Sequence, residues 1–314
     1  MMNIKIYILL IVLLVSSETF TSCGSSQEDT STDINIPNED IDCCDENQEY
    51  KTSSYLHSLK ELATYESNQS KYVIKLYTND SLQVGYNDLY YAIEKVSNGK
   101  HVKDFNIAEI TPIMTMGSMN NMQHSTPIGS IEQVDGVPIY HSWISFLMPT
   151  NTGSNNIWSL SFNYQIRDSV GAISNQPLNV KASSTGLSYL KSFKYNGDTY
   201  FMSLVNPNNF VTGVNTIKAY ISKKSSTITT PYALASEQFI VEITPTMPDM
   251  GNHTSPNNEA LTQSTDGTYT GKINLTMIGL WNIHLVVKTL DGTIVAGGDN
   301  DDSGYSNLYW TVNI

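Results

Sequence analysis

Methionine and histidine are concentrated in two short stretches of this chain. Residues 110–127 read ITPIMTMGSMNNMQHSTP, and residues 243–256 read ITPTMPDMGNHTSP, so both follow the same Ile-Thr-Pro lead-in. Thioether sulfur and imidazole nitrogen are neutral, soft-to-borderline ligands that suit Cu(I). The candidate metal ligands are Met114, Met116, Met119, Met122 and His124 in the first stretch, and Met247, Met250 and His253 in the second.

The positions of the other methionines support this interpretation. The chain has 11 methionines, and beyond Met1, Met2 and the six in the two stretches only three remain. Met148 and Met277 end the strands that follow the two stretches, and we include them as additional or capping ligands, although a methionine in a strand is more often a core residue. Methionines that fill core gaps would be spread across strands. The structural alternative is a Met-rich loop that plugs the open end of a β-sandwich.

Local geometry decides whether these side chains meet. In an extended chain, Met114 and Met116 share one face, and so do Met122 and His124. A reversal through residues 117–121, which include Gly117, would bring the two pairs together.

The elements that must position these residues are predicted to be strands. Short apolar or alternating runs at 72–77, 88–93, 158–162, 239–243 and 281–287 are bounded by Gly, Asn, Asp and Pro, and no long stretch has a 3.6-residue period. This spacing predicts an all-β protein of antiparallel sandwiches. The order strand, strand, Met/His loop, strand ending in Met, and Trp strand occurs twice. We therefore expect two tandem immunoglobulin-like β-sandwiches at 69–168 and 190–314, joined by a small, polar junction.

The N-terminal residues have the composition of a targeting segment and a tether. An apolar run at residues 6–15 follows Lys5 and is too short to span a membrane as a helix, which is typical of a signal peptide over 1–22. The sequence FTSCGSS around Cys23 resembles a bacterial lipoprotein signal, so we expect Cys23 to be lipidated. Residues 23–68 are acidic and polar, which predicts a disordered tether with a short helical patch near 55–62. The role of the adjacent Cys43 and Cys44 stays open between soft-metal binding and none.

Charge and motifs exclude several classes of function. The formal net charge is −13 and only 15% of residues are charged, which argues against nucleic acid as a partner. No nucleophile elbow, phosphate loop or zinc-protease helix is present, so we do not expect an enzyme. Residues 299–304 read DNDDSG, like the opening of a calcium loop, but the twelfth position is Trp310 rather than Glu, which favours a solvated hairpin tip.

The second half of the chain resembles the YtkA/FixH-like family of extracytoplasmic immunoglobulin-like domains. The resemblance is carried by MPDMGNH at 247–253, GTYTGKINLTM at 267–277 and GLW at 279–281. It is weaker for the first copy, which has extra methionines, a longer gap between Met148 and Trp158, and Pro149 in place of Ile278. The resemblance implies copper handling and favours the Met247, Met250 and His253 loop as the better-supported site.

The sequence thus predicts a lipid-anchored copper-binding protein of the bacterial cell envelope, on the outer membrane. It would buffer, deliver or confer tolerance to Cu(I), and its partners would be the membrane and a copper-accepting or copper-exporting envelope protein. The alternative is an adhesin-like scaffold of immunoglobulin-like domains that binds no metal, since a fold alone does not choose a function.

Overall fold

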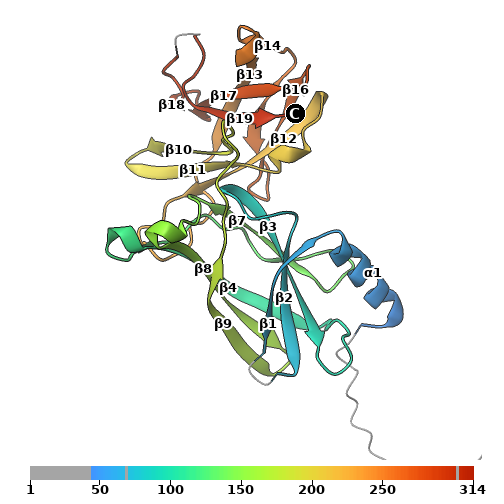
Figure 1. Ribbon diagram of the computed structural model, residues 1–314. Helices are drawn as coiled ribbons and strands as arrows, with labels where there is room; N and C mark the ends of the chain where they lie inside the picture. Colours follow the sequence, from blue (N-terminus) through green and yellow to red (C-terminus); the bar gives the residue numbers. More distant parts are fainter. Residues whose placement is uncertain (1–43, 68–69, 302–303) are drawn as a thin grey trace, which may run out of the picture. The chain divides into compact units, whose positions relative to one another are not determined.

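The structure is a computed structural model that describes residues 44–67, 70–301 and 304–314. The predicted signal peptide, Cys23 and the tether as far as residue 43 lie outside these residues. The all-β prediction is confirmed, because antiparallel strands dominate the described chain and α1 (Glu46–His57) is its one α-helix (Figure 1). Within the same described ranges, no helix has the length and apolar character that a membrane crossing requires.

Strands β1 to β9 form a first sandwich of two antiparallel sheets. One sheet has the order β1 (Lys60–Glu66), β2 (Tyr72–Thr78), β3 (Gly85–Lys95), β7 (Tyr140–Phe146), β6 (Glu132–Gln133), and the other has the order β5 (Met122–His124), β4 (Phe105–Met116), β8 (Asn156–Ile166), β9 (Ser169–Leu178). Every second residue of β8 from Trp158 onward is buried, as expected for a strand with one face on a core. Tyr91 of β3 and Phe162 of β8 meet edge to face at 5.3 Å between ring centroids, so the core lies between the two sheets.

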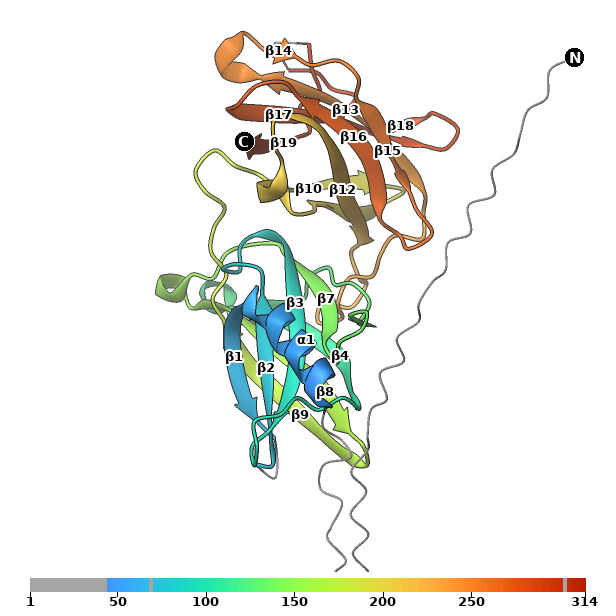
Figure 2. The same cartoon turned by 90° about the vertical axis from the view of Figure 1, so that its right-hand side faces the viewer.

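Strands β10 to β19 form a second sandwich. Its strand order is β10 (Leu190–Tyr195), β11 (Asp198–Leu204), β12 (Gly213–Lys223), β16 (Tyr269–Leu275), β15 (Glu259–Gln263), β13 (Phe239–Met247), β17 (Leu280–Thr289), β18 (Ile294–Ala296), with β14 (His253–Thr254) paired to β13 and β19 (Tyr309–Asn313) paired to β17 (Figure 2). Because β15 pairs with both β16 and β13, the two halves belong to one continuous hydrogen-bonded sheet. Trp281 and Trp310 are fully buried in its core.

The two sandwiches share a strand order. The neighbours β2-β3-β7 and β5-β4-β8 of the first correspond to β11-β12-β16 and β14-β13-β17 of the second. The buried tryptophan also recurs: Trp158 donates its indole N–H to the carbonyl of Met148 at 2.8 Å, and Trp281 donates to the carbonyl of Met277 at 2.9 Å. The same hydrogen bond therefore fixes the central tryptophan in both halves.

Two elements occupy part of the range that the sequence assigns to a disordered tether, 23–68. Helix α1 begins after Asp45, whose carboxylate accepts a hydrogen bond from the backbone N–H of Gln48 at 2.8 Å, and β1 pairs along β2. The predicted helical patch near 55–62 overlaps only the end of α1, and β1 begins at Lys60. The helix buries only Thr52 and Leu56, too few for a clear helical period that would mark its true bounds. The folded part of the chain thus includes residues from Glu46 onward, earlier than residue 69.

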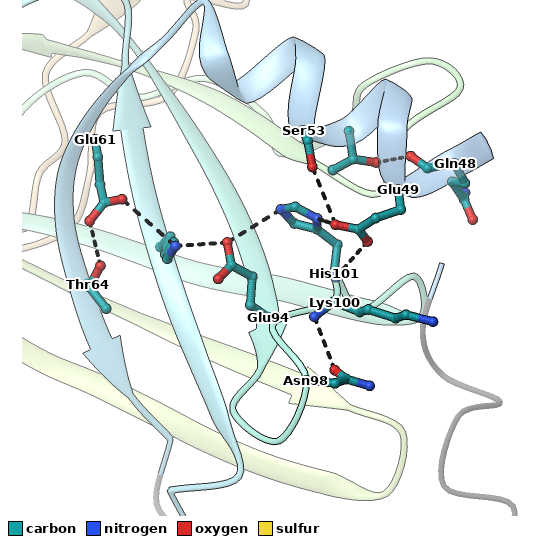
Figure 3. Close-up of polar contacts among 11 residues, drawn as sticks. Gln48, Glu49, Ser53, Glu61, Thr64, Glu94, Asn98, Lys100 and His101 are labelled. Atoms are coloured by element: carbon teal, nitrogen blue, oxygen red, sulfur yellow. Dashed lines mark hydrogen bonds and ion pairs between the residues drawn. The ribbon is translucent and has the colours of Figure 1, made fainter. Parts of the chain in front are cut away.

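A buried histidine joins α1 to the first sandwich (Figure 3). His101 places Nδ1 2.5 Å from Oε1 of Glu49, and its backbone N–H donates to the other oxygen of Glu49 at 2.9 Å. On the opposite side of the ring, Nε2 lies 3.5 Å from Glu94, which is also 2.9 Å from the ammonium of Lys75. One side chain on α1 is therefore held by both the backbone and the ring of a residue 52 positions away.

The junction between the sandwiches is shorter than residues 169–189. Strand β9 occupies Ser169–Leu178 and pairs with β8 over most of its length, so the first sandwich continues past residue 168. The described residues, from 44 to 314 with their two short gaps, belong to one compact unit. Within it, Trp143 of β7 stacks on Tyr220 of β12 at 4.3 Å, and the hydroxyls of Ser145 and Ser203 are 2.6 Å apart.

Candidate metal-binding hairpins

The first Met/His stretch is a β-hairpin that gathers four predicted ligands on one face. Strands β4 and β5 are connected by the 3-10 turn η1 (Gly117–Met119), and their register sets Met116 opposite Met122 and Met114 opposite His124. Residues directly opposite in an antiparallel pair project to the same side, and so do residues two apart in one strand. All four side chains therefore lie on the same face, with Met119 in the turn.

Burial changes steadily along this hairpin. Met114 is 0% exposed and belongs to the core of the first sandwich, while Met116 is half-buried against that core. Met119 and Met122 are 49% and 44% exposed. The sulfur donors thus extend from the core to solvent. Met119 and Met122, at the solvent end, are too exposed to act as core packing residues.

His124 is held in one tautomer by its neighbour. Its Nδ1 lies 2.9 Å from the carbonyl oxygen of Ser125, and its ring meets Trp158 edge to face at 5.5 Å between centroids. A carbonyl can only accept, so Nδ1 carries the proton, and in the neutral imidazole Nε2 keeps its lone pair. Histidine ligands of metals are oriented by this kind of hydrogen bond on the other ring nitrogen.

The second Met/His stretch has the same hairpin with fewer donors. The 3-10 turn η4 (Pro248–Met250) connects β13 to β14, and the register sets Met247 opposite His253. Met247 is 4% exposed, whereas Met250 is 54% exposed and His253 is also exposed. The methyl group of Met247 packs on Gly279, where an added Cβ would lie 3.0 Å from it. Met247 therefore has a packing role in addition to its position beside His253.

The two turns have the same backbone conformation. Met116 and Met247 precede the turns with φ of −103° and −102°, and two left-handed residues follow each turn, Asn120 and Asn121 in the first and Gly251 and Asn252 in the second. The turns are thus Met-x-x-Met-x-x-Met in the first hairpin and Met-x-x-Met-x-x-His in the second. His253 corresponds in place to Met122, not to His124. The reason is that the segment from Pro112 to the first turn is two residues longer than the segment from Pro245 to the second turn.

Met148 and Met277 contribute differently from the hairpin methionines. Both side chains are partly buried against the two cores, and their carbonyls accept the indole N–H of the central tryptophans. Met277 is two residues from Gly279, the contact of Met247. The structure gives both residues a packing and hydrogen-bonding role, and their role as metal ligands stays a prediction.

His141 and His284, which lie outside the hairpins, make structural hydrogen bonds. His141 Nε2 lies 2.8 Å from the buried carboxylate of Asp88. His284 is buried between the hydroxyl of Thr246 at 3.0 Å and the carbonyl of Ser306 at 2.7 Å. Among the described residues, no group of three or more His, Cys, Asp or Glu is arranged to hold a metal ion.

The structure adds Ser125 to the residues that matter for the first hairpin. Ser125 is fully buried, its carbonyl orients His124, and its hydroxyl donates to the carbonyl of Pro112 at 2.7 Å. Sequence reasoning missed it because a serine next to a histidine is common, and only the register shows which carbonyl faces the ring.

Comparisons with known proteins bear on the second sandwich. Residues 195–286 match the family described as YtkA-like, and this range includes the whole second hairpin. A search of curated proteins finds no match to the chain. Among solved structures, the adhesin InvE of Yersinia pseudotuberculosis aligns with 10% identity and a TM-score of 0.21, over 74% of this chain and 56% of that one. The aligned region thus spans about half of the adhesin, and a similarity at this level carries no functional argument.

Proposed function

We propose that this protein, in which residues 195–286 form a YtkA-like domain, binds Cu(I) as cargo through its methionine and histidine hairpins. The observation that carries the proposal is the β4–β5 register, which sets Met114, Met116, Met122 and His124 on one face. The free Nε2 of His124 adds a nitrogen donor to the sulfur donors.

The donor chemistry fits a soft monovalent cation. Thioether and imidazole groups suit Cu(I), whereas zinc sites are built from Cys, His, Asp and Glu. The exposed donors are neutral, so they leave the single positive charge of Cu(I) uncompensated. A site of this kind exchanges its ion readily, which suits buffering, delivery or tolerance.

The two hairpins support the proposal in different ways. The second lies inside the matched family range, and it offers Met247, Met250 and His253. The first offers the larger donor set, with two well-exposed methionines and an oriented histidine. We propose that both bind Cu(I), with Met148 and Met277 next to the bound ion.

The proposal extends to the cell envelope. Lipidation of Cys23 would anchor the chain to the outer membrane on the tether that follows. An exposed Met/His turn at the end of a sandwich is accessible to a partner, which we propose is a copper-accepting or copper-exporting envelope protein.

The test is a Cu(I) titration of the metal-free protein under reducing conditions, against a chromophoric Cu(I) chelator. One variant replaces the first set (Met116→Leu, Met119→Leu, Met122→Leu, His124→Asn), and a second replaces the other set (Met247→Leu, Met250→Leu, His253→Asn). Met202→Leu is the matched control, because Met202 is fully buried in β11 and lies outside both hairpins.

We expect each hairpin variant to lose one bound Cu(I) with its unfolding transition retained, and Met202→Leu to bind as the wild type does. Unchanged stoichiometry and affinity in both hairpin variants would refute the proposal. That result would favour the scaffold function, which requires no donor atoms in these turns.

A further inference from the structure

A segment of the second sandwich is hydrogen-bonded to the end of the first hairpin. Ser125, directly after β5, donates its backbone N–H to the carbonyl of Ile228 at 2.7 Å. Tyr232 donates its N–H to the carbonyl of Thr126 at 3.0 Å and accepts from the N–H of Ile128 at 3.3 Å. Residues 228–232, which we call the docking segment, therefore pair with residues 125–128.

These bonds surround the carbonyl that orients His124. The Ser125 carbonyl accepts the Nδ1–H of His124, and its peptide unit lies between two others. The preceding unit donates to Ile228, and the following unit accepts from Tyr232. Because both neighbours are bonded to the docking segment, the direction of the Ser125 carbonyl is fixed from both sides.

The docking segment is itself attached to strands β11 and β12 of the second sandwich. Tyr232 is 1% exposed, and its ring stacks on Phe201 of β11 at 5.7 Å with 21° between the planes. Leu234 forms a bridge with Ser222 of β12. The position of the docking segment thus follows the position of the second sandwich.

We propose that docking of residues 228–232 makes the second sandwich a determinant of Cu(I) affinity at the first hairpin. Docking fixes the Ser125 carbonyl, the carbonyl holds the proton of His124 on Nδ1, and Nε2 is presented as a ligand. Ser125 is thus a positioning residue for His124. The inference rests on the proposed function for its affinity readout, while the tautomer of His124 is measured without metal.

The experiment uses the full chain with the second hairpin inactivated (Met247→Leu, Met250→Leu, His253→Asn), so that the measured Cu(I) affinity is that of the first hairpin. In this background, Tyr232→Ala removes the ring that anchors the docking segment. Tyr220→Ala is the matched control, because Tyr220 also joins the two sandwiches, through Trp143, but in the described structure it neither hydrogen-bonds to nor stacks on residues 125–128. The measurements are the His124 tautomer by 15N NMR of the metal-free protein and Cu(I) affinity by chelator competition.

We expect Tyr232→Ala to lose the pure Nδ1–H tautomer and to weaken Cu(I) binding by roughly 10-fold or more, as for other residues that orient metal ligands. Tyr220→Ala should change neither. An unchanged tautomer and affinity in Tyr232→Ala, with faster hydrogen exchange at the Ser125 amide to show that the segment has been released, would overturn the inference. If the parent binds no Cu(I), the proposed function fails at the first hairpin, and the tautomer still decides whether docking positions His124.

A second pair of variants covers the case in which Tyr232→Ala does not fold. Ser125→Pro removes the N–H that Ile228 accepts, whereas Ser125→Ala keeps this N–H and the carbonyl and loses only the hydroxyl. We expect Ser125→Pro to shift the tautomer and lower the affinity, and Ser125→Ala to stay within about threefold of the parent. Equal behaviour of the two would contradict a role for docking.

Discussion

Methionines of the first hairpin differ in what they contribute to the fold. Met114 is fully buried in the core, whereas Met122, on the same face of the hairpin, is 44% exposed. A thioether in a core fills volume and stabilises the fold, and an exposed one stabilises little. The structural alternative of a Met-rich plug therefore describes Met114 but not Met122.

Truncation of these two residues separates packing from ligand function. We expect Met114→Ala to lower the free energy of unfolding by about 2–5 kcal/mol, because it leaves a cavity in a packed core. The same change at Met122 should stay within about 0.5 kcal/mol. Urea unfolding followed by tryptophan fluorescence measures both. A large loss of stability in Met122→Ala would show that the exposed methionine is a packing residue.

At the residue scale, much of the first site was predictable from its sequence. The alternation of Met114 with Met116 and of Met122 with His124 predicted one shared face each, and the register joins the two pairs. The correspondence of His253 with Met122 was not predictable. An alignment that starts from the shared Ile-Thr-Pro lead-in shifts the two turns by two residues relative to each other. The two turns match instead in backbone conformation, with Met116 in the place of Met247, and only the dihedral angles show this.

At the scale of elements, α1 is attached to the sandwich chiefly through a few side chains. Glu49 bonds both the ring and the backbone N–H of His101, which is buried. Loss of this acceptor leaves buried donors without a partner, which costs more than the loss of an exposed hydrogen bond. The helix thus depends on one carboxylate to a degree that its own sequence does not show.

Substitution of that carboxylate tests the attachment. Glu49→Gln keeps one side-chain oxygen, so one of the two His101 donors loses its acceptor. We therefore expect it to lower the free energy of unfolding by about 1–3 kcal/mol and to speed hydrogen exchange throughout α1. Glu46→Gln, at an exposed position of the same first turn, is the control and should change neither. Urea unfolding and hydrogen exchange by mass spectrometry provide the two measurements. Identical exchange in both variants would mean that α1 is held by its apolar contacts alone.

The elements that the sequence did not predict share one physical property. Helix α1 and strands β1 and β9 bury few large apolar side chains, and β9 has the small and polar residues of an edge strand. Their places are set by their partners. Glu49 is held by His101, 52 residues away, and β9 by its hairpin register with β8, the strand directly before it. The central strands were predictable because burial of one face imposes its own period on the sequence.

At the scale of the whole molecule, both sandwiches are built around buried tyrosines. Burial raises the pKa of Tyr91 in the first core and raises the pKa of Tyr269 in the second to about 12. The pKa of Tyr86 is raised as well, first by burial and then by the carboxylate of Asp88, to which its hydroxyl donates. Each of these phenols is therefore more easily ionised in the unfolded chain, where the pKa is near 10.

This difference predicts a loss of stability in alkali. A raised folded pKa means that the stabilisation is fully present below about pH 10 and is lost as the pH rises toward 12. For Tyr269 alone the loss is on the order of 2 kcal/mol, since one pKa unit corresponds to about 1.4 kcal/mol.

We expect the urea midpoint, followed by circular dichroism from pH 8 to pH 11.5, to be constant at first and then to fall. Tyr269→Phe should be less stable at pH 8, because the N–H of Phe239 loses its acceptor, but should fall less steeply above pH 10. A midpoint that stays constant through pH 11.5 would contradict the conclusion that burial raises the pKa of these tyrosines.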